Sequence, residues 1–258
     1  LASIMSGTLL YTLDNPNDYG TAANDQFGRR VAITESYSVI GAYSEDEAGA
    51  LYSGKAYIYD NLDGSLLYTL DNPDPDNGSN GDAFGYSVGI TESYAIVGAM
   101  NESDAGGTLS GKAYIFDTST GSLLYTLNNP NAYSTPAHDR FGYGVGICES
   151  YAIVGAPFED EAGGDGSGKA YIFDTSNGSL LYTLNNPNAY STSASDYFGE
   201  VVGISESYAI VGVADEDDSG GTSSGKAYIF RTSNGNLLHT LDNPNDYSTS
   251  ADDNFGFS

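Results

Sequence analysis

Short stretches of alternating apolar and polar residues run along the whole chain, and no stretch has the 3.6-residue apolar period of an amphipathic helix. Residues 84–127 show the pattern once in full. Within them, four runs read as short strands: 86–90, 94–99, 112–116 and 123–127. Tight turns at Glu92 and Gly121 join the runs in pairs, a long polar loop separates the pairs, and Pro130 ends the last run because proline cannot continue a ladder. We therefore predict four strands and no helix in this stretch.

The same pattern recurs along the chain with a fixed period of 57 residues. A Phe-Gly pair marks each unit, at Phe27-Gly28, Phe84-Gly85, Phe141-Gly142, Phe198-Gly199 and Phe255-Gly256. Asn-Pro, Gly-Lys-Ala-Tyr-Ile and Leu-Leu-Tyr/His-Thr-Leu repeat at the same spacing, without insertion or deletion. A constant period of this length indicates units that share one fold.

Four strands per unit at this spacing are typical of a β-propeller blade. One unit is too small to bury its apolar surface alone, so neighbouring units must cover it. We predict an all-β fold, a β-propeller-like array of four-stranded antiparallel blades with a 57-residue repeat. Residues 1–258 then form one repeat domain, with complete blades at about 27–70, 84–127, 141–184 and 198–241, a leftover strand at 7–13 and a partial repeat at 242–258.

The third unit carries three linked motifs: Phe141-Gly142, Gly155-Ala156-Pro157 and Gly168-Lys169-Ala170-Tyr171-Ile172-Phe173. Together they resemble the FG-GAP repeat family, which builds the seven-bladed propeller of integrin alpha subunits and many secreted bacterial and algal proteins. The resemblance extends over all four complete units. It implies propeller blades and an extracellular or cell-surface protein, in a fold that hosts adhesion, scaffolding and enzyme accessory roles.

The sequence departs from integrin-type repeats between the first and second strands of each unit. That family carries a calcium loop there, Asp-x-Asp-x-Asp-Gly-x-x-Asp, whereas this chain has a short turn such as Thr91-Glu92-Ser93-Tyr94. One carboxylate cannot supply the six to eight oxygen ligands of calcium. The chain therefore resembles a short-turn variant without the usual calcium loop.

The number of blades in the assembled protein stays open. Seven units of this length would need about 400 residues if the family's ring size applied. A segment of a longer secreted chain, an open array that continues into the next subunit and a closed four-bladed ring all fit the sequence. The constant period suits the open array, and a segment of a long secreted repeat protein is favoured.

Net charge excludes some classes of partner. The chain carries a formal charge of −27 with eight lysines and arginines, so it lacks the clustered cations that nucleic-acid phosphates or anionic lipids require. No apolar run reaches the ~20 residues of a membrane helix, so no membrane insertion is expected. Cys148 is the single cysteine, and His138 and His239 are the only histidines, which leaves little material for disulfides or histidine catalysis.

Acidic loops follow the second strand of every unit and are candidate metal sites. Two positions in each loop are always acidic: Glu45 and Glu47, Glu102 and Asp104, Glu159 and Glu161, Glu216 and Asp218. Carboxylates two residues apart, followed by glycine-rich backbone, could bind calcium weakly. The alternative is a solvated acidic rim that keeps the protein soluble. No other cofactor is expected.

Other recurring polar residues have structural interpretations. An aspartate precedes each Phe-Gly by two residues and is expected to form an Asx-turn, at Asp25, Asp82, Asp139, Asp196 and Asp253. The lysines that open the third strands are expected to pair with carboxylates: Lys55, Lys112, Lys169 and Lys226. Tyrosines that repeat in the second and third strands are interpreted as inter-blade packing rather than a sugar-stacking platform. Glycosylation sequons begin at Asn77, Asn101 and Asn177.

These features favour a structural or adhesive extracellular protein that presents repeated loops to a protein partner, to a glycan or to copies of itself, as a filament or surface-layer subunit. The alternative is a propeller module that binds cations or glycans. An enzyme is not predicted, because catalytic residues should appear once and almost every charged residue here recurs with the period.

Overall fold

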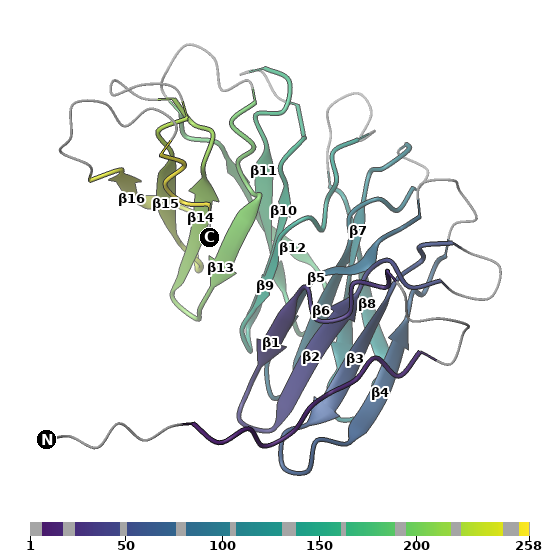
Figure 1. Ribbon diagram of the computed structural model, residues 1–258. Helices are drawn as coiled ribbons and strands as arrows, with labels where there is room; N and C mark the ends of the chain where they lie inside the picture. The colour runs from purple at the N-terminus through teal and green to yellow at the C-terminus, as the bar shows by residue number, and fades with distance from the viewer. Residues whose placement is uncertain are drawn as a thin grey trace, which may run out of the picture.

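The computed structural model describes residues 7–17, 24–46, 51–75, 81–103, 107–130, 138–160, 164–188, 195–217, 223–244 and 253–257. Across these ranges the chain forms sixteen strands and no helix. The strands make four antiparallel four-stranded sheets, each built from consecutive strands. We call these sheets blades 1 to 4; they follow one another in a fan, with blade 1 and blade 4 at its two ends (Figure 1). The predicted all-β array of four-stranded blades is confirmed.

The blades have closely similar strand bounds. Blade 1 contains β1 (Val31–Ile33), β2 (Tyr37–Ala42), β3 (Lys55–Asp60) and β4 (Leu66–Asp71). Blade 2 contains β5 (Phe84–Ile90), β6 (Tyr94–Ala99), β7 (Lys112–Asp117) and β8 (Leu123–Asn128). Blade 3 contains β9 (Val145–Ile147), β10 (Tyr151–Ala156), β11 (Lys169–Asp174) and β12 (Leu180–Asn185). Blade 4 contains β13 (Val201–Ile204), β14 (Tyr208–Val213), β15 (Lys226–Arg231) and β16 (Leu237–Asp242).

Two details differ from the sequence prediction. The first strand starts at the Phe-Gly pair only in blade 2; elsewhere it starts later, as at Val31 and Val145. The pair is instead engaged with the preceding blade, and even in blade 2 the register shifts between Phe84 and Ser87. Residues 7–13, predicted as a leftover fourth strand, are not a strand, because the described part of the chain holds no third strand of their own unit with which they could form a ladder.

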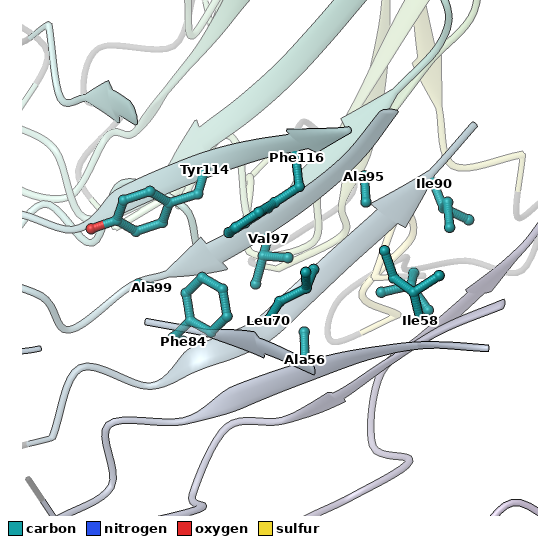
Figure 2. Packing of buried hydrophobic residues seen from close by; sticks show 11 residues of the cluster. Ala56, Ile58, Leu70, Phe84, Ile90, Ala95, Val97, Ala99, Tyr114 and Phe116 are labelled. Atoms are coloured by element: carbon teal, nitrogen blue, oxygen red, sulfur yellow. The ribbon is translucent and has the colours of Figure 1, made fainter. Parts of the chain in front are cut away.

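Each inter-blade core joins opposite faces of two successive blades. We call the face turned toward the next blade the leading face and the other the trailing face. Ala56, Ile58 and Leu70 on the leading face of blade 1 pack against Phe84, Val97 and Phe116 on the trailing face of blade 2 (Figure 2). The same pairing of faces recurs between blades 2 and 3 and between blades 3 and 4. Side-chain alternation along each strand therefore supplies two apolar faces, and both are needed.

The Phe-Gly pair also joins the blades through the backbone. The N–H of Phe84 donates to the carbonyl of Ser53, 3.0 Å away, and Gly54 and Phe84 form an isolated parallel bridge. The N–H groups of Phe141 and Phe198 make the same bond to the carbonyls of Ser110 and Ser167. We call this junction the blade clasp. The blade clasp explains why the Phe-Gly motif recurs: the motif lies at or just before the first strand of one blade and bonds to the backbone of the preceding blade.

Glycines make the clasp possible. A Cβ on Gly41 or Gly98 would fall well inside van der Waals contact with the carbonyl oxygen of the Phe-Gly glycine in the next blade. A Cβ on Gly142 would collide with the carbonyl oxygen of Lys112, and Gly142 also has a positive φ of 91°. Because backbone atoms rather than side chains approach at these points, no larger residue can adapt by choosing another rotamer.

Replacement of Gly142 by alanine should therefore destabilise the protein more than replacement of Gly28. The two glycines have nearly equal φ angles, 91° and 86°, so both variants suffer a left-handed backbone strain of about 1–2 kcal/mol. Only Gly142 faces a neighbouring blade, whereas a Cβ on Gly28 would meet nothing within 4 Å. We expect an additional loss of about 1–3 kcal/mol for Gly142→Ala in chemical denaturation. Equal losses for the two variants would show that the clasp tolerates a methyl group.

Candidate functional site

The first acidic position of each loop is buried in all four blades. The side chains concerned are those of Glu45, Glu102, Glu159 and Glu216. Each carboxylate accepts hydrogen bonds on both oxygens from a third-strand tyrosine; Tyr114 Oη lies 2.7 and 2.8 Å from the oxygens of Glu102. A lysine completes the cluster in blades 2, 3 and 4, where Nζ of Lys112, Lys169 and Lys226 lies 2.7 Å from the glutamate. We call this arrangement the buried triad.

Local geometry brings the triad together. The glutamate follows the second strand at a turn in which its N–H donates to the carbonyl three residues earlier, as from Glu102 to Ala99. Its carbonyl then accepts the N–H of the glycine that opens the third strand, here Gly111. Lysine and tyrosine stand two residues apart on that strand, so their side chains lie on one face. In blade 1 the corresponding lysine, Lys55, pairs with Asp71. The prediction that these lysines pair with carboxylates is confirmed.

Burial changes the ionisation of these glutamates. Desolvation raises the pKa of Glu45, Glu102 and Glu159 to about 7, although tyrosine and lysine oppose the shift by stabilising the carboxylate. The pKa of Glu216 is raised for the same reason. Burial and the adjacent carboxylate also raise the pKa of Tyr114 and Tyr228, so both remain phenols. Each triad therefore joins the loop after the second strand to the third strand, and the charge of its glutamate changes with pH.

The structure places only half of each predicted calcium pair. Glu47, Asp104, Glu161 and Asp218, the second acidic positions, lie outside the described residues. The first positions accept hydrogen bonds from tyrosine and, in blades 2 to 4, also pair with lysine. No group of three His, Cys, Asp or Glu side chains within the described ranges is placed to hold a metal ion. Calcium binding by these loops stays a prediction.

The aspartate before each Phe-Gly has a structural partner. Asp82 Oδ2 accepts a hydrogen bond of 2.8 Å from Nδ2 of Asn72, the asparagine of the Asn-Pro motif. The corresponding bonds join Asn15 to Asp25, Asn129 to Asp139, Asn186 to Asp196 and Asn243 to Asp253. This bond spans the long connection between two blades. It explains why Asn-Pro and the aspartate recur together, a link that their spacing alone did not reveal.

The opposite edge of the array, where the short turns lie, carries a second set of inter-blade contacts. Glu92 Oε1 accepts the N–H groups of Glu35 and Ser36 in the preceding blade, at 3.1 and 3.2 Å. Tyr68 on β4 donates to the carbonyl of Ser119, and its Cγ stands 2.6 Å from where a Cβ on Gly121 would lie. The Thr-Glu-Ser turn and the fourth-strand tyrosine therefore link blades.

The remaining predicted positions are spread over the surface. Asn177 is exposed on a turn and Asn101 is half-buried, while Asn77 lies outside the described residues. Burial raises the pKa of the half-buried Cys148 thiol to about 11, which does not suit a nucleophile. These positions do not form a shared cluster.

A row of aromatic side chains crosses the edge with the long loops, and sequence analysis missed it. Tyr43, Tyr86, Tyr143, Phe158 and Tyr197 form the row, with successive ring centroids 5.4, 5.0, 6.0 and 5.0 Å apart. Three arginines lie over its rings at 4.9 to 5.8 Å: Arg29, Arg30 and Arg140. The row spans all four blades. Tyr86 and Tyr143 are equivalent positions of the repeat, and the other members have no aromatic counterpart in the other units. Departure from the repeat was the signal that could have found it.

Two hollows lie along this aromatic row. One, of about 270 Å³, is lined by residues of the first strands of blades 2, 3 and 4 and by Arg30, Tyr143 and Glu200. Burial raises the pKa of Glu200, whose Oε1 accepts a hydrogen bond of 3.3 Å from Tyr143, while Arg30 acts in the opposite direction. The other, of about 410 Å³, lies between blades 3 and 4 beside Phe158. Aromatic walls with a few charged groups are typical of small-molecule sites.

Blades that cover one another's apolar faces define a repeat protein of β-propeller-like architecture. The sequence profile of the FG-GAP repeat matches residues 18–59, 75–116, 132–173 and 189–230, more than half of the chain. This protein belongs to the FG-GAP repeat family. A comparison with curated proteins finds no match.

Family membership indicates only a broad class of function. FG-GAP repeats occur in extracellular adhesion-type proteins, mediate protein interactions and are typically non-enzymatic. Within the described ranges, no helix is long and apolar enough to cross a membrane.

The buried triads predict a stability that depends on pH. The pKa of Glu159 is raised from 4.5 to about 7 by folding, so the folded protein holds more protons than the unfolded chain between these values. Protonation of these glutamates favours the folded state. The resulting stabilisation is complete below about pH 4.5 and is lost as the pH rises through about 7, where the buried carboxyl groups ionise. Glu159→Gln cannot titrate and should show a shallower fall of Tm across this window, measured by calorimetry.

Glu149→Gln is the matched control, since Glu149 is exposed on the turn between β9 and β10. It should retain the dependence of Tm on pH of the original protein. A slope in Glu159→Gln equal to that of the control would contradict a titrating triad.

Proposed function

We propose that this protein is an extracellular structural or adhesive module. Its end blades join a second copy of the protein head to tail, and its long loops are displayed along one edge of the resulting array. The proposal is carried by one observation: the leading face of blade 4 is built like the three buried leading faces, but it is uncovered.

The uncovered face is evident from equivalent positions. Ile210 is 43% exposed, whereas its counterparts Ile96 and Ile153 are 0% exposed. Leu241 is 36% exposed, whereas Leu127 and its other counterparts are at most 2% exposed. A cavity of about 520 Å³ lies on this face, lined by apolar residues that include Ile229 and Leu238. An apolar surface of this kind marks an interaction site in a folded protein.

The complementary half stands at the other end of the array. Val31 and Ile33 on the trailing face of blade 1 are 65% and 73% exposed, whereas Ile90, the counterpart of Ile33, is 9% exposed. A Cβ on Gly28 would meet no atom within 4 Å, so the half of a clasp that this glycine offers is unused.

Each end face fits a blade of the same kind, and the proposal is that a second copy supplies it. Blade 1 of one copy presents to blade 4 of another the same pairing of faces that the chain uses three times internally. The joint continues an existing interface rather than creating a new one, and such heterologous contacts generate rings or filaments. Phe255 now occupies the clasp of blade 4, and Tyr11 packs beside Gly64 of blade 1. An incoming blade would replace these two segments with its own equivalents.

Self-association should therefore depend on Ile210. We expect the mass of the protein in sedimentation velocity to rise with concentration, and Ile210→Asp to keep it monomeric because a charge would be buried in the joint. Leu180→Asp is the control, because Leu180 is 42% exposed on blade 3, away from both end faces. A monomer at every concentration, or association that persists in Ile210→Asp, would contradict the proposed joint.

A further inference from the structure

The hollow between blades 3 and 4 has the features of a built ligand site. Its volume is about 410 Å³, within the range of small-molecule pockets. Blade 3 contributes Arg140, Phe158 and Asp160, and the segment leading into blade 4 contributes Ser195 and Tyr197. Its position on the edge with the long loops separates it from the end faces used in the proposed self-association.

The hollow exists because a glycine replaces a larger residue. Gly166 takes the place that Tyr52 occupies in the first unit and Leu109 in the second. The backbone is the same in all three, with φ of 65°, 53° and 57°. In blade 1, Tyr52 packs so closely on Gly81 that a Cβ there would overlap it. Gly166 therefore leaves open the space that Tyr52 fills in the first unit, and the backbone does not require a glycine there.

The wall of the hollow is aromatic. The rings of Phe158 and Tyr197 lie 5.0 Å apart at an angle of 53°. The guanidinium of Arg140 lies 4.9 Å from the centre of the Phe158 ring, which holds it at the rim. These rings offer an apolar surface of the size of one sugar ring or one small planar molecule.

The rim combines hydrogen-bond donors with acceptors. Asp160 Oδ1 accepts the N–H of Gly166 at 2.8 Å, which fixes the carboxylate, and a carboxylate has acceptor sites beyond the one that this bond uses. Asp165 adds a second exposed carboxylate. Arg140 and His138, which also line the hollow, supply donors. A ligand that fits must donate and accept around its edge and present one apolar face.

These residues are not needed for the fold. Units one and two have Gln26 and Ala83 where Arg140 stands, and Ser44 and Asn101 where Phe158 stands. Both units form complete blades with the same strands. Arg140 and Phe158 differ from their counterparts in these units, and both line the same hollow. Ligand binding explains this departure from the repeat better than packing does.

We propose that this hollow binds a neutral hexopyranose, with one face of the sugar stacked on Phe158 and Tyr197 and its hydroxyl groups bonded to Asp160 and Arg140. A pyranose ring has an apolar C–H face and a rim of hydroxyls that donate and accept, which matches the lining. The two aspartates and the net charge of −27 disfavour an anionic sugar. Arg140 beside the aromatic wall disfavours a cation. Sugar binding at this hollow does not depend on self-association through the end blades, so the two are tested separately.

The test uses the whole 258-residue chain and four neutral probes: methyl glucoside, methyl galactoside, methyl mannoside and N-acetylglucosamine. Saturation-transfer NMR should detect at least one of them, with its dissociation constant measured by calorimetry. Gly166→Leu refills the hollow with the residue of the second unit, and Phe158→Ser installs the residue of the first. Each variant should weaken binding about tenfold or more.

Tyr52→Leu is the control, because it installs the same leucine at the equivalent position of blade 1, outside the hollow. It should bind the sugar like the original protein, and Ile210→Asp should do so as well. Unchanged circular dichroism and Tm would show that the variants remain folded. Glucuronate and glucosamine are tested alongside as charged comparisons. The proposal is overturned if no neutral probe binds, including the case in which only a charged sugar binds, or if Gly166→Leu binds a neutral probe as tightly as the original protein.

Discussion

The structure depends on the approach of one blade's backbone to the next. At each junction a Phe-Gly pair bonds to the backbone ahead of the third strand and passes over a glycine of the second, as Phe141 and Gly142 do on blade 2. The phenylalanine is buried by this approach and anchors the core between the blades. Hydrogen bonds and apolar burial thus act at one point, and both require glycine on each side.

The second organising feature is the burial of charge in a very acidic protein. Each triad places a carboxylate inside a blade, where tyrosine and lysine satisfy its oxygens, and thereby ties the loop after the second strand to the third strand. Because the triad fixes the start of this loop, the sequence of the rest of the loop can differ between units while the blade keeps its four strands. The edge with the long loops is therefore where units differ, and the hollow beside Phe158 lies there.

Much of this arrangement could be predicted from periodicity. Strand positions in the second unit agree with the structure to within two residues, because alternating apolar residues and turn residues act locally. The pairing of Lys169 with a carboxylate was also predicted. The burial of Glu159 was not, since its acidic neighbours in the sequence made it resemble a solvated rim. Nor was the late start of β9, because the residues before it bond to another blade.

The sequence by itself determined the unit: its length, its four strands, its glycines and its membership in a series, because these depend on contacts that recur every 57 residues. Only the tertiary structure decided which residues of different units meet. Arg140 and Phe158 come from one unit and Tyr197 from the next, and nothing in their spacing shows that they share a hollow. Likewise, Ile210 has the same apolar neighbours in the chain as Ile153, and only the array shows that one is covered and the other is not. The physical reason is that burial depends on which blade stands alongside, which is a property of the whole assembly.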